Sequence, residues 1–263
     1  MTDLLAQVGR GGIAVGSFLV DFGRLLRSFL YWTVIAPFKG YPIRMHEAAR
    51  QSVRVGVQSI PIVFLVNFFV GATLAFTVAE ILNLFGANAY TGAVMGVGFW
   101  RELGPLLTGI VMAGYVGASL AAEIGTMKVG EEIMALEASA LNPVRFLAVP
   151  RLLAVLAMVP VVTLMGTVFG IYGGYIVCVG VLGQNASVYW DQMIEPMENV
   201  DIRLGLIKSF IFATIVGVTG LVQGFRVRGG AEGVGAATTN AVVYSIIFII
   251  VADLAVTALH YFG

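Results

Sequence analysis

Four long stretches of this chain contain no aspartate, glutamate, lysine or arginine, and each is long enough for the roughly 20 apolar residues of a membrane-spanning helix. In hydrocarbon, backbone groups must find hydrogen bonds within the protein, which leaves helices or closed barrels. The alternating pattern typical of barrel strands is absent. The sequence therefore predicts an all-α integral membrane protein. The charge-free stretches are Val55–Ala79, Leu103–Ala122, Leu152–Tyr189 and Gly233–Ala252.

Composition supports the membrane assignment and excludes one class of partner. Hydrophobic residues make up 59% of the 263 residues and charged residues 11%, against roughly 25% charged residues in soluble domains. The formal net charge is zero, so there is no electrostatic basis for binding nucleic acid. The single cysteine, Cys178, lies in an apolar stretch and cannot form an intramolecular disulfide, which favours a place in the packed core.

Five spans are predicted near residues 55–82, 91–122, 152–183, 204–226 and 237–261. The positive-inside rule places the basic connections, and with them the N-terminus and the polar segment 123–151, in the cytoplasm. An odd number of spans then puts the C-terminus on the outer side. The basic residues that share the cytoplasmic side are Arg44, Arg50, Arg54, Lys128, Arg145, Arg151, Arg226 and Arg228. The opposite side carries the acidic loop with Asp191, Glu195, Glu198 and Asp201.

Residues 1–52 form a separate region of mixed character before the membrane-spanning part, residues 53–263. Apolar residues recur there near helical spacing, while Arg24 and Arg27 lie on other faces, which is typical of a helix in the membrane interface. The alternative is a tilted spanning helix from Val15 to Ala36, interrupted by Asp21 and the two arginines. The apolar residues are Ile13, Leu19, Phe22, Leu25, Leu26, Phe29 and Leu30.

Small residues recur four positions apart in several spans. This spacing lets helix backbones approach closely where lipid provides no hydrophobic drive, so it predicts a tightly packed bundle. The sets are Gly92/Gly96, Ala113/Gly117/Ala121, Gly166/Gly170/Gly174 and Gly220/Gly224.

The second span carries Arg101 and Glu102 near its middle, roughly 15 Å below its start at Thr91. Charges at this depth cost at least about 2.5–3.5 kcal/mol each unless they are paired or hydrated. Pro105 follows and cannot donate a hydrogen bond to the carbonyl of Arg101, which weakens the helix locally.

Three further charges lie at similar depth or nearer the outer end: Glu80, Lys208 and Asp253. We expect these residues, with Arg101 and Glu102, to line a water-filled cavity open to the outside. The alternative is a set of buried ion pairs that fix the rotation of the helices.

No catalytic or metal-binding pattern is found in the sequence. Ser119 lacks the glycine that would follow a hydrolase nucleophile, and the two histidines, His46 and His260, lie far apart. The glutamates of segment 123–151 come without His or Cys at metal-ligand spacing. The chain has no P-loop motif, so a partner must handle any ATP.

The polar segment 123–151 is patterned as an amphipathic helix from Lys128 to Leu141, which Asn142-Pro143 ends. Glu137 falls within its apolar stripe, where a charge requires a cationic partner. We expect this helix to dock into a groove of another protein. The alternative is a helix resting on the bilayer, which its acidic bias disfavours. The stripe consists of Val129, Ile133, Leu136 and Ala140, and the opposite face of Lys128, Glu132 and Ser139.

Five linked motifs carry a family resemblance over roughly residues 45–263. They are Arg-Glu-Leu-Gly-Pro at 101–105, Ala-Glu-Ile-Gly-Thr-Met at 122–127, Glu-Glu-Ile-x-Ala-Leu-Glu at 131–137, Asn-Pro-Val-Arg-Phe at 142–146 and Gly-Gly-Ala-Glu-Gly-Val-Gly-x-Ala-Thr-Thr at 229–239. In this order they resemble the MlaE-type (YrbE-like) permeases, the membrane subunits of ABC transporters that move phospholipids between membranes. Asn142 departs mildly, since many relatives have Asp there.

The resemblance implies a homodimer of five-span subunits in the bacterial inner membrane, each with an N-terminal interfacial helix. A dimer of cytoplasmic ABC ATPases would contact the helix between spans two and three, and a periplasmic MCE-domain protein would bind on the other side. ATP and Mg would lie on the ATPase, with no cofactor in this chain. The residues expected to couple to the ATPase are Lys128, Glu131, Glu132, Ile133, Leu136, Glu137, Pro143 and Arg145.

The same resemblance implies that phospholipid occupies an outward-open cavity at the dimer interface, in agreement with the placement of the charged residues. We expect Arg101 and Lys208 to attract the headgroup, and Glu102 and Asp253 to pair or gate. An ion- or proton-coupled carrier is the alternative, with the intramembrane charges as coupling sites. Such carriers often contain internal repeats, and none is found in this sequence. A non-transporting scaffold would leave Arg101 and Glu102 unexplained.

Overall fold

The computed structural model describes residues 2–262, with side chains from residue 16 onward, and this part of the chain is entirely helical apart from turns and short connections. The predicted all-α class is confirmed. The α-helices are α1 (Thr2–Leu30), α2 (Met45–Gly56), α3 (Ile60–Leu84), α4 (Thr91–Gly98), α5 (Gly104–Met112), α6 (Ala118–Val129), α7 (Glu132–Ala138), α8 (Val149–Tyr175), α9 (Ala186–Ile194), α10 (Asn199–Arg226) and α11 (Gly230–Phe262). Short 3-10 turns are η2 (Ala36–Lys39), η3 (Val57–Ser59) and η4 (Asn88–Tyr90). Wider π-helical turns are η1 (Tyr31–Ile35), η5 (Phe99–Leu103), η6 (Ala113–Gly117), η7 (Val144–Ala148) and η8 (Ile176–Val181).

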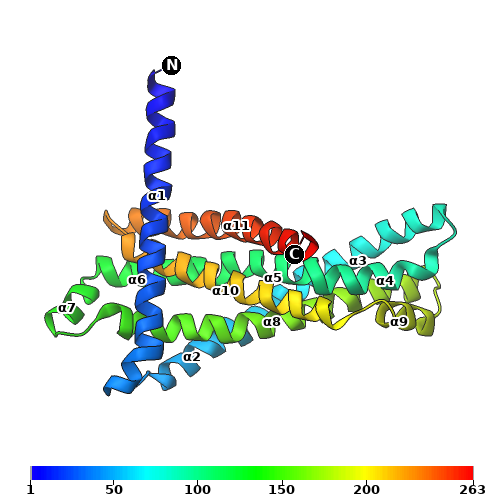
Figure 1. The fold of residues 1–263 in the computed structure, drawn as a ribbon, viewed down its shortest axis with the longest axis horizontal. Helices are drawn as coiled ribbons and strands as arrows, with labels where there is room; N and C mark the ends of the chain where they lie inside the picture. The colour runs from blue at the N-terminus through cyan, green and yellow to red at the C-terminus, as the bar shows by residue number, and fades with distance from the viewer. Residues whose placement is uncertain (1, 263) are drawn as a thin grey trace.

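Among the described residues, five helical segments are long and apolar enough to cross a membrane, as predicted. They run along the long axis of the molecule in Figure 1. The first begins at Met45, ahead of the predicted residue 55, because α2 continues through η3 into α3. The second continues past the predicted residue 122 to Val129. The five segments are Met45–Leu84, Asn88–Val129, Val144–Val181, Asn199–Arg226 and Gly230–Phe262.

Helix α1 lies across this bundle, near the end that also carries α7 (Figure 1). Helix α1 is not among the described segments that are long and apolar enough to cross a membrane, and its place in the membrane interface stays a prediction. Phe18 is buried and its ring lies 5.1 Å from that of Tyr244 in α11, while Leu19 and Leu30 are exposed. The apolar residues of α1 thus divide between a face that packs on the bundle and a face open to lipid. The side chain of Ile13, counted in the predicted stripe, lies outside the described side chains.

Helix α10 is the centre of the bundle and α11 is its most exposed spanning helix. Helix α10 packs against α5, α6, α8 and α11, and α8 in turn packs against α2 and α3. Only a stripe of α11 faces inward, formed by Ala237, Ala241, Ser245 and Ile249. Cys178 is buried, as expected for a core residue.

Glycines bring the helix backbones into direct contact, as their spacing predicts. A methyl group added at Gly71 of α3 would overlap the carbonyl oxygen of Gly170 of α8. On the other side of the bundle, a methyl group at Gly220 of α10 would meet the carbonyl oxygen of Gly117. The predicted tight packing is confirmed at these crossings.

The predicted helix from Lys128 to Leu141 is not present as one element. Helix α6 carries span two onward to Val129, and Gly130 and Glu131 then form a turn in which Glu131 has a φ of 60°. A left-handed residue cannot continue a right-handed helix, so α7 starts only at Glu132. Lys128 therefore belongs to the end of a spanning helix, and the isolated element is only seven residues long.

We expect Gly71→Ala to lower the free energy of unfolding by about 1–3 kcal/mol, because the added methyl group meets backbone atoms that cannot turn aside. Thermal unfolding of the purified protein in detergent measures the loss. Gly98→Ala is the matched control, since no described heavy atom lies within 4 Å of a methyl group there. Equal melting temperatures for the two variants would contradict the packing argument.

Candidate functional site

Arg101 and Glu102 lie on a π-helical turn within the second spanning segment. The N–H of Gly104 donates to the carbonyl of Phe99, five residues back, instead of four. Pro105 follows and has no N–H to offer, so the regular ladder is interrupted at this point, as the sequence indicates. The widened turn presents the two side chains toward α10 and α11. π-helical turns inside α-helices are frequent at functional sites.

Arg101 is paired with an acidic residue that the sequence analysis placed in the outer loop. Its Nε lies 2.7 Å from Oδ1 of Asp201, and its Nη2 contacts the same oxygen. Its Nη1 lies 3.4 Å from the hydroxyl of Tyr261. Asp201 is fully buried, and its Oδ2 also accepts a hydrogen bond from the backbone N–H of Glu198 in a capping box that starts α10. The spacing of Glu198 and Asp201, two acids three residues apart before an apolar run, is the sequence signal that could have placed Asp201 at the start of this helix.

Lys208 of α10 is the more enclosed of the two cations, with its side chain 1% exposed. Its ammonium contacts Oε2 of Glu102 and lies 2.8 Å from Oδ1 of Asp253. It also donates to Oγ1 of Thr257 at 2.8 Å, and that hydroxyl donates to Oε1 of Glu102 at 2.9 Å. The sequence analysis missed Thr257, one helical turn beyond Asp253 on α11.

The structure thus brings four of the five predicted cavity residues together, and it does so through ion pairs. Two cations, Arg101 and Lys208, face three carboxylates, those of Glu102, Asp201 and Asp253. The ammonium of Lys208 donates hydrogen bonds to Glu102 and Thr257 and forms an ion pair with Asp253. Arg101 and Glu102 keep 25% and 32% of their side chains exposed, so these two are the charges that a ligand can reach.

Glu80 does not belong to this network. It lines a separate cavity of about 600 Å³ at the end of α3, together with Asn83, Asn88 and Gln184. Its position near the end of the first spanning segment is as predicted, but it forms no ion pair with the described residues of the network.

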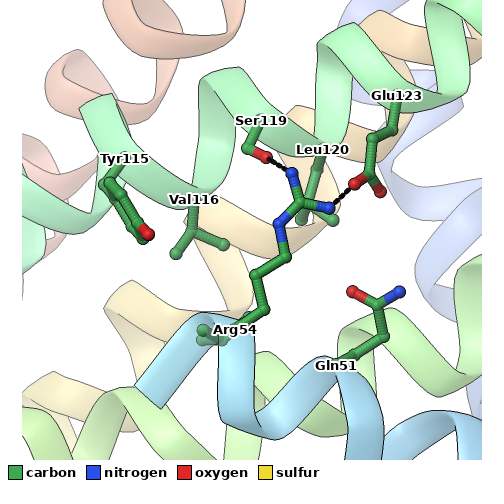
Figure 2. Close-up of a pocket in the computed structure, with 8 residues that line it drawn as sticks. Gln51, Arg54, Tyr115, Val116, Ser119, Leu120 and Glu123 are labelled. Carbon is green, nitrogen blue, oxygen red and sulfur yellow. Dashed lines mark hydrogen bonds and ion pairs between the residues drawn. The ribbon is translucent and has the colours of Figure 1, made fainter. Parts of the chain in front are cut away.

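A second ion cluster lies at the other end of the bundle and joins α2, α6 and α8; Figure 2 shows its α2–α6 part, with Arg54 beside Ser119 and Glu123. Glu123 of α6 forms ion pairs with Arg54 of α2 and with Arg151 of α8, the latter at 3.2 Å. Arg54 also donates to Ser119 at 2.8 Å, and Arg151 donates to the carbonyl of Leu147 at 2.9 Å. The adjoining cavity measures about 20 Å³, room for about one water molecule, so the cluster is a clamp and not a ligand site.

The predicted coupling residues fall into two groups. Glu131, Glu132 and Glu137 are exposed on or beside α7, whereas Ile133 and Leu136 are partly buried against the subunit's own core. The apolar stripe of α7 therefore faces inward, and Glu137 lies outside it, contrary to the amphipathic pattern expected for a longer helix.

The other predicted coupling residues face their own subunit. The Lys128 ammonium donates to the carbonyl of Phe225. Arg145, in the π-turn that follows Pro143, lies 4.9 Å from the ring centre of Tyr41 and 5.6 Å from that of Trp32. These contacts attach the segment that follows α7 to the segment that connects α1 with α2. Within the described residues, no group of three or more His, Cys, Asp or Glu side chains is arranged to hold a metal ion.

Comparisons with known proteins agree with this arrangement. The family described as Permease MlaE matches residues 48–259. A probable ABC transporter permease protein of Rickettsia typhi is 35% identical over 247 residues, covering 93% of this chain and 95% of the relative. The intermembrane phospholipid transport system permease protein MlaE of Haemophilus influenzae is 32% identical over 94% of this chain and 96% of its own length. The chloroplastic protein TRIGALACTOSYLDIACYLGLYCEROL 1 of Arabidopsis thaliana is 32% identical over 84% of this chain and 63% of its own length.

We expect Lys208→Met to destabilise the protein by about 3–5 kcal/mol, because it leaves two carboxylates facing one another in a largely buried site. Adding Glu102→Gln and Asp253→Asn to this variant removes both uncompensated charges and should restore most of the loss. Thermal unfolding in detergent compares the single and triple variants. If the triple variant is as unstable as the single one, charge pairing is not what Lys208 contributes.

Proposed function

Because the chain belongs to the MlaE family of ABC transporter permeases, we propose that it is the membrane subunit of an ATP-driven transporter that moves phospholipids between membranes. The Haemophilus relative carries intermembrane phospholipid transport in its name. The observation that carries the proposal is the exposed Arg101–Glu102 pair, a cation and an anion held on a π-helical turn inside an apolar bundle. Such a pair suits the charged headgroup of a lipid whose chains stay among apolar side chains.

The proposed transporter contains two copies of this subunit, with lipid between them in a cavity open to the outside. Large apolar side chains on α3 and α11, such as Phe69 and Leu254, are exposed along these helices. A second copy would cover part of this surface. Arg101 would attract the phosphate, because its guanidinium retains N–H donors beyond those bound to Asp201 and Tyr261.

The motor in this proposal is a dimer of cytoplasmic ABC ATPases that holds ATP and Mg, since the sequence has no P-loop. It would bind α7 through the exposed acids Glu131, Glu132 and Glu137. The N-terminus would then be cytoplasmic and the C-terminus periplasmic, in a bacterial inner membrane. A periplasmic protein with an MCE domain would receive or deliver lipid at the opposite end.

The ion pairs of Glu123 with Arg54 and Arg151 would transmit movement from the ATPase to the proposed lipid site. Helix α7 is joined by a single turn to α6, which carries Glu123, and ion pairs link this residue to Arg54 of α2 and Arg151 of α8. Movement of α7 would therefore displace three spanning segments together. When the ATPases close, this displacement would rotate the spans and compress the cavity.

An ion- or proton-coupled carrier is the second candidate, favoured by the position of Lys208 between Glu102 and Asp253. In that case the network would bind and release the coupling ion during transport. Lipid transport that persists in proteoliposomes without ATP would favour this candidate over the ABC transporter.

We expect an ATPase to co-purify with the tagged full-length chain, and Glu137→Lys to reduce its recovery several-fold by reversing an exposed charge on α7. Glu195→Lys is the matched control, the same change at the opposite end of the bundle. Membrane levels of both variants, measured by immunoblot, should equal those of the wild type. Equal ATPase recovery for both variants would exclude Glu137 as a contact, and absence of any ATPase would contradict the proposed function.

We expect the double variant Arg101→Gln, Asp201→Asn to bind less phospholipid than Asp201→Asn alone. The double variant loses the cation without leaving Asp201 as a buried, unpaired carboxylate. Lipid that co-purifies with each complex is quantified by mass spectrometry. Equal lipid occupancy would indicate that Arg101 serves only as the structural partner of Asp201.

A further inference from the structure

A polar cleft of about 510 Å³ lies on the same side of the bundle as α7, and neither the lipid site nor the coupling surface uses it. It opens between α1, the C-terminal ends of α6 and α10, and the first part of α11. Its lining includes Ser17, Asp21, Lys128, Gln223, Phe225, Arg226, Arg228, Asn240 and Tyr244.

Positive charge prevails in this cleft. Arg226 pairs with Asp21 at 3.0 Å and donates to Ser17 at 2.7 Å, and this pair fastens α1 to α10. Lys128 donates to the carbonyl of Phe225, which leaves its charge uncompensated by that contact. Arg228 is exposed and forms no ion pair with any described side chain. Three cations therefore face one carboxylate around the cleft.

Gln223 is the unusual group in the cleft. Its side chain belongs to a residue that is only 6% exposed, yet its amide forms no hydrogen bond with any described residue. Its amide atoms are not enclosed but open onto the cleft, so a ligand there can reach them. Asn240, which also lines the cleft, is exposed and forms no hydrogen bond with a described residue. The cleft thus contains amide donors together with positive charge, the combination that binds phosphate oxygens.

An apolar cavity of about 390 Å³ adjoins the cleft on the other side of the Arg226–Asp21 pair. The two cavities share Asp21, Phe225 and Arg226. Leu25 and Val222 are among the apolar residues of the second cavity. A polar, basic cleft next to an apolar cavity matches an amphiphile with an anionic head and a hydrocarbon chain, and it does not match a free inorganic ion.

We propose that this cleft binds the phosphate headgroup of an anionic phospholipid from the leaflet in which α1 lies. Basic pockets between spanning helices are known to bind such headgroups. The amides of Gln223 and Asn240 would donate to phosphate oxygens, Arg228 and Lys128 would supply the charge, and an acyl chain would extend into the adjoining apolar cavity. The bound lipid would attach α1 to α10 and α11.

This site differs from the transported lipid's site in its residues and in its end of the bundle. The inference does not depend on transport, and only the identification of the leaflet as cytoplasmic rests on the proposed orientation. The location beside an interfacial helix favours lipid over an acidic segment of a partner protein, which the test below treats as a separate outcome.

The test uses the purified full-length chain in a neutral detergent, with phosphatidylglycerol as the probe and phosphatidylcholine as the zwitterionic comparison. Native mass spectrometry measures the affinity for each lipid. We expect Arg228→Gln to weaken phosphatidylglycerol binding about fivefold, the effect of one basic residue near a lipid headgroup. Arg27→Gln, which removes an exposed arginine of α1 outside both cavities, is the matched control and should leave the affinity unchanged.

Gln223→Leu tests the amide directly. Without lipid this variant should melt at the same temperature as the wild type or higher, because the amide forms no hydrogen bond with a described residue that the substitution would remove. Phosphatidylglycerol should raise the melting temperature of the wild type but not that of the variant. A melting temperature that rises equally in both proteins would overturn the role of Gln223.

Two results would overturn the lipid assignment as a whole. If sn-glycerol 3-phosphate or inorganic phosphate displaces phosphatidylglycerol at concentrations near that of the lipid, the site recognises free phosphate. If Arg228→Gln leaves lipid affinity unchanged but weakens recovery of a co-purifying protein, the cleft is a protein-docking surface.

Discussion

In a bilayer, apolar side chains gain little by leaving lipid for a protein interior, so spanning helices must be held by close backbone approach and by polar contacts. This subunit uses both close backbone approach and polar contacts. Gly71 meets Gly170 and Gly220 meets Gly117 where the helices cross, and these crossings set the distances between α3, α8, α10 and α6. Everything else in the subunit depends on them, since the charged groups can pair only if the helices that carry them are held at such short separation.

The two ion networks use that proximity in different ways. In the network proposed to bind lipid, three carboxylates and two cations from the second, fourth and fifth spanning segments converge, and part of the network stays accessible. At the opposite end, Glu123 is enclosed between two arginines and joins the first three segments. One network therefore combines ion pairing with partly exposed charges, while the other links three helices. Segment two, through α6 and η5, belongs to both.

The sequence predicts those features that depend on residues close to one another along the chain. Charge-free runs indicate the five spans, four-residue spacing indicates the glycine crossings, and depth in the span indicates that Arg101, Glu102, Lys208 and Asp253 lie close together. Pairings depend on how each helix is rotated about its axis, and the π-helical turns change that rotation without a clear sequence mark. For this reason Asp201 was not predicted as the partner of Arg101, and Glu80 was wrongly grouped with the network. Helix α7 is shorter than its pattern suggests because Gly130 and Glu131 form a turn.

The order in which the chain is synthesised gives the outer network a further consequence. Arg101 and Glu102 enter the membrane about midway through translation, but their partners Asp201 and Lys208 follow 100 and 106 residues later, and Thr257 follows Glu102 by 155 residues. Until then the second span carries two uncompensated charges in a hydrocarbon environment that disfavours them. A chain that ends before α10 retains this defect. Synthesis of α10 supplies both missing partners, and α11 then adds Asp253 and Thr257 around Lys208, so the network is completed only by the last helix.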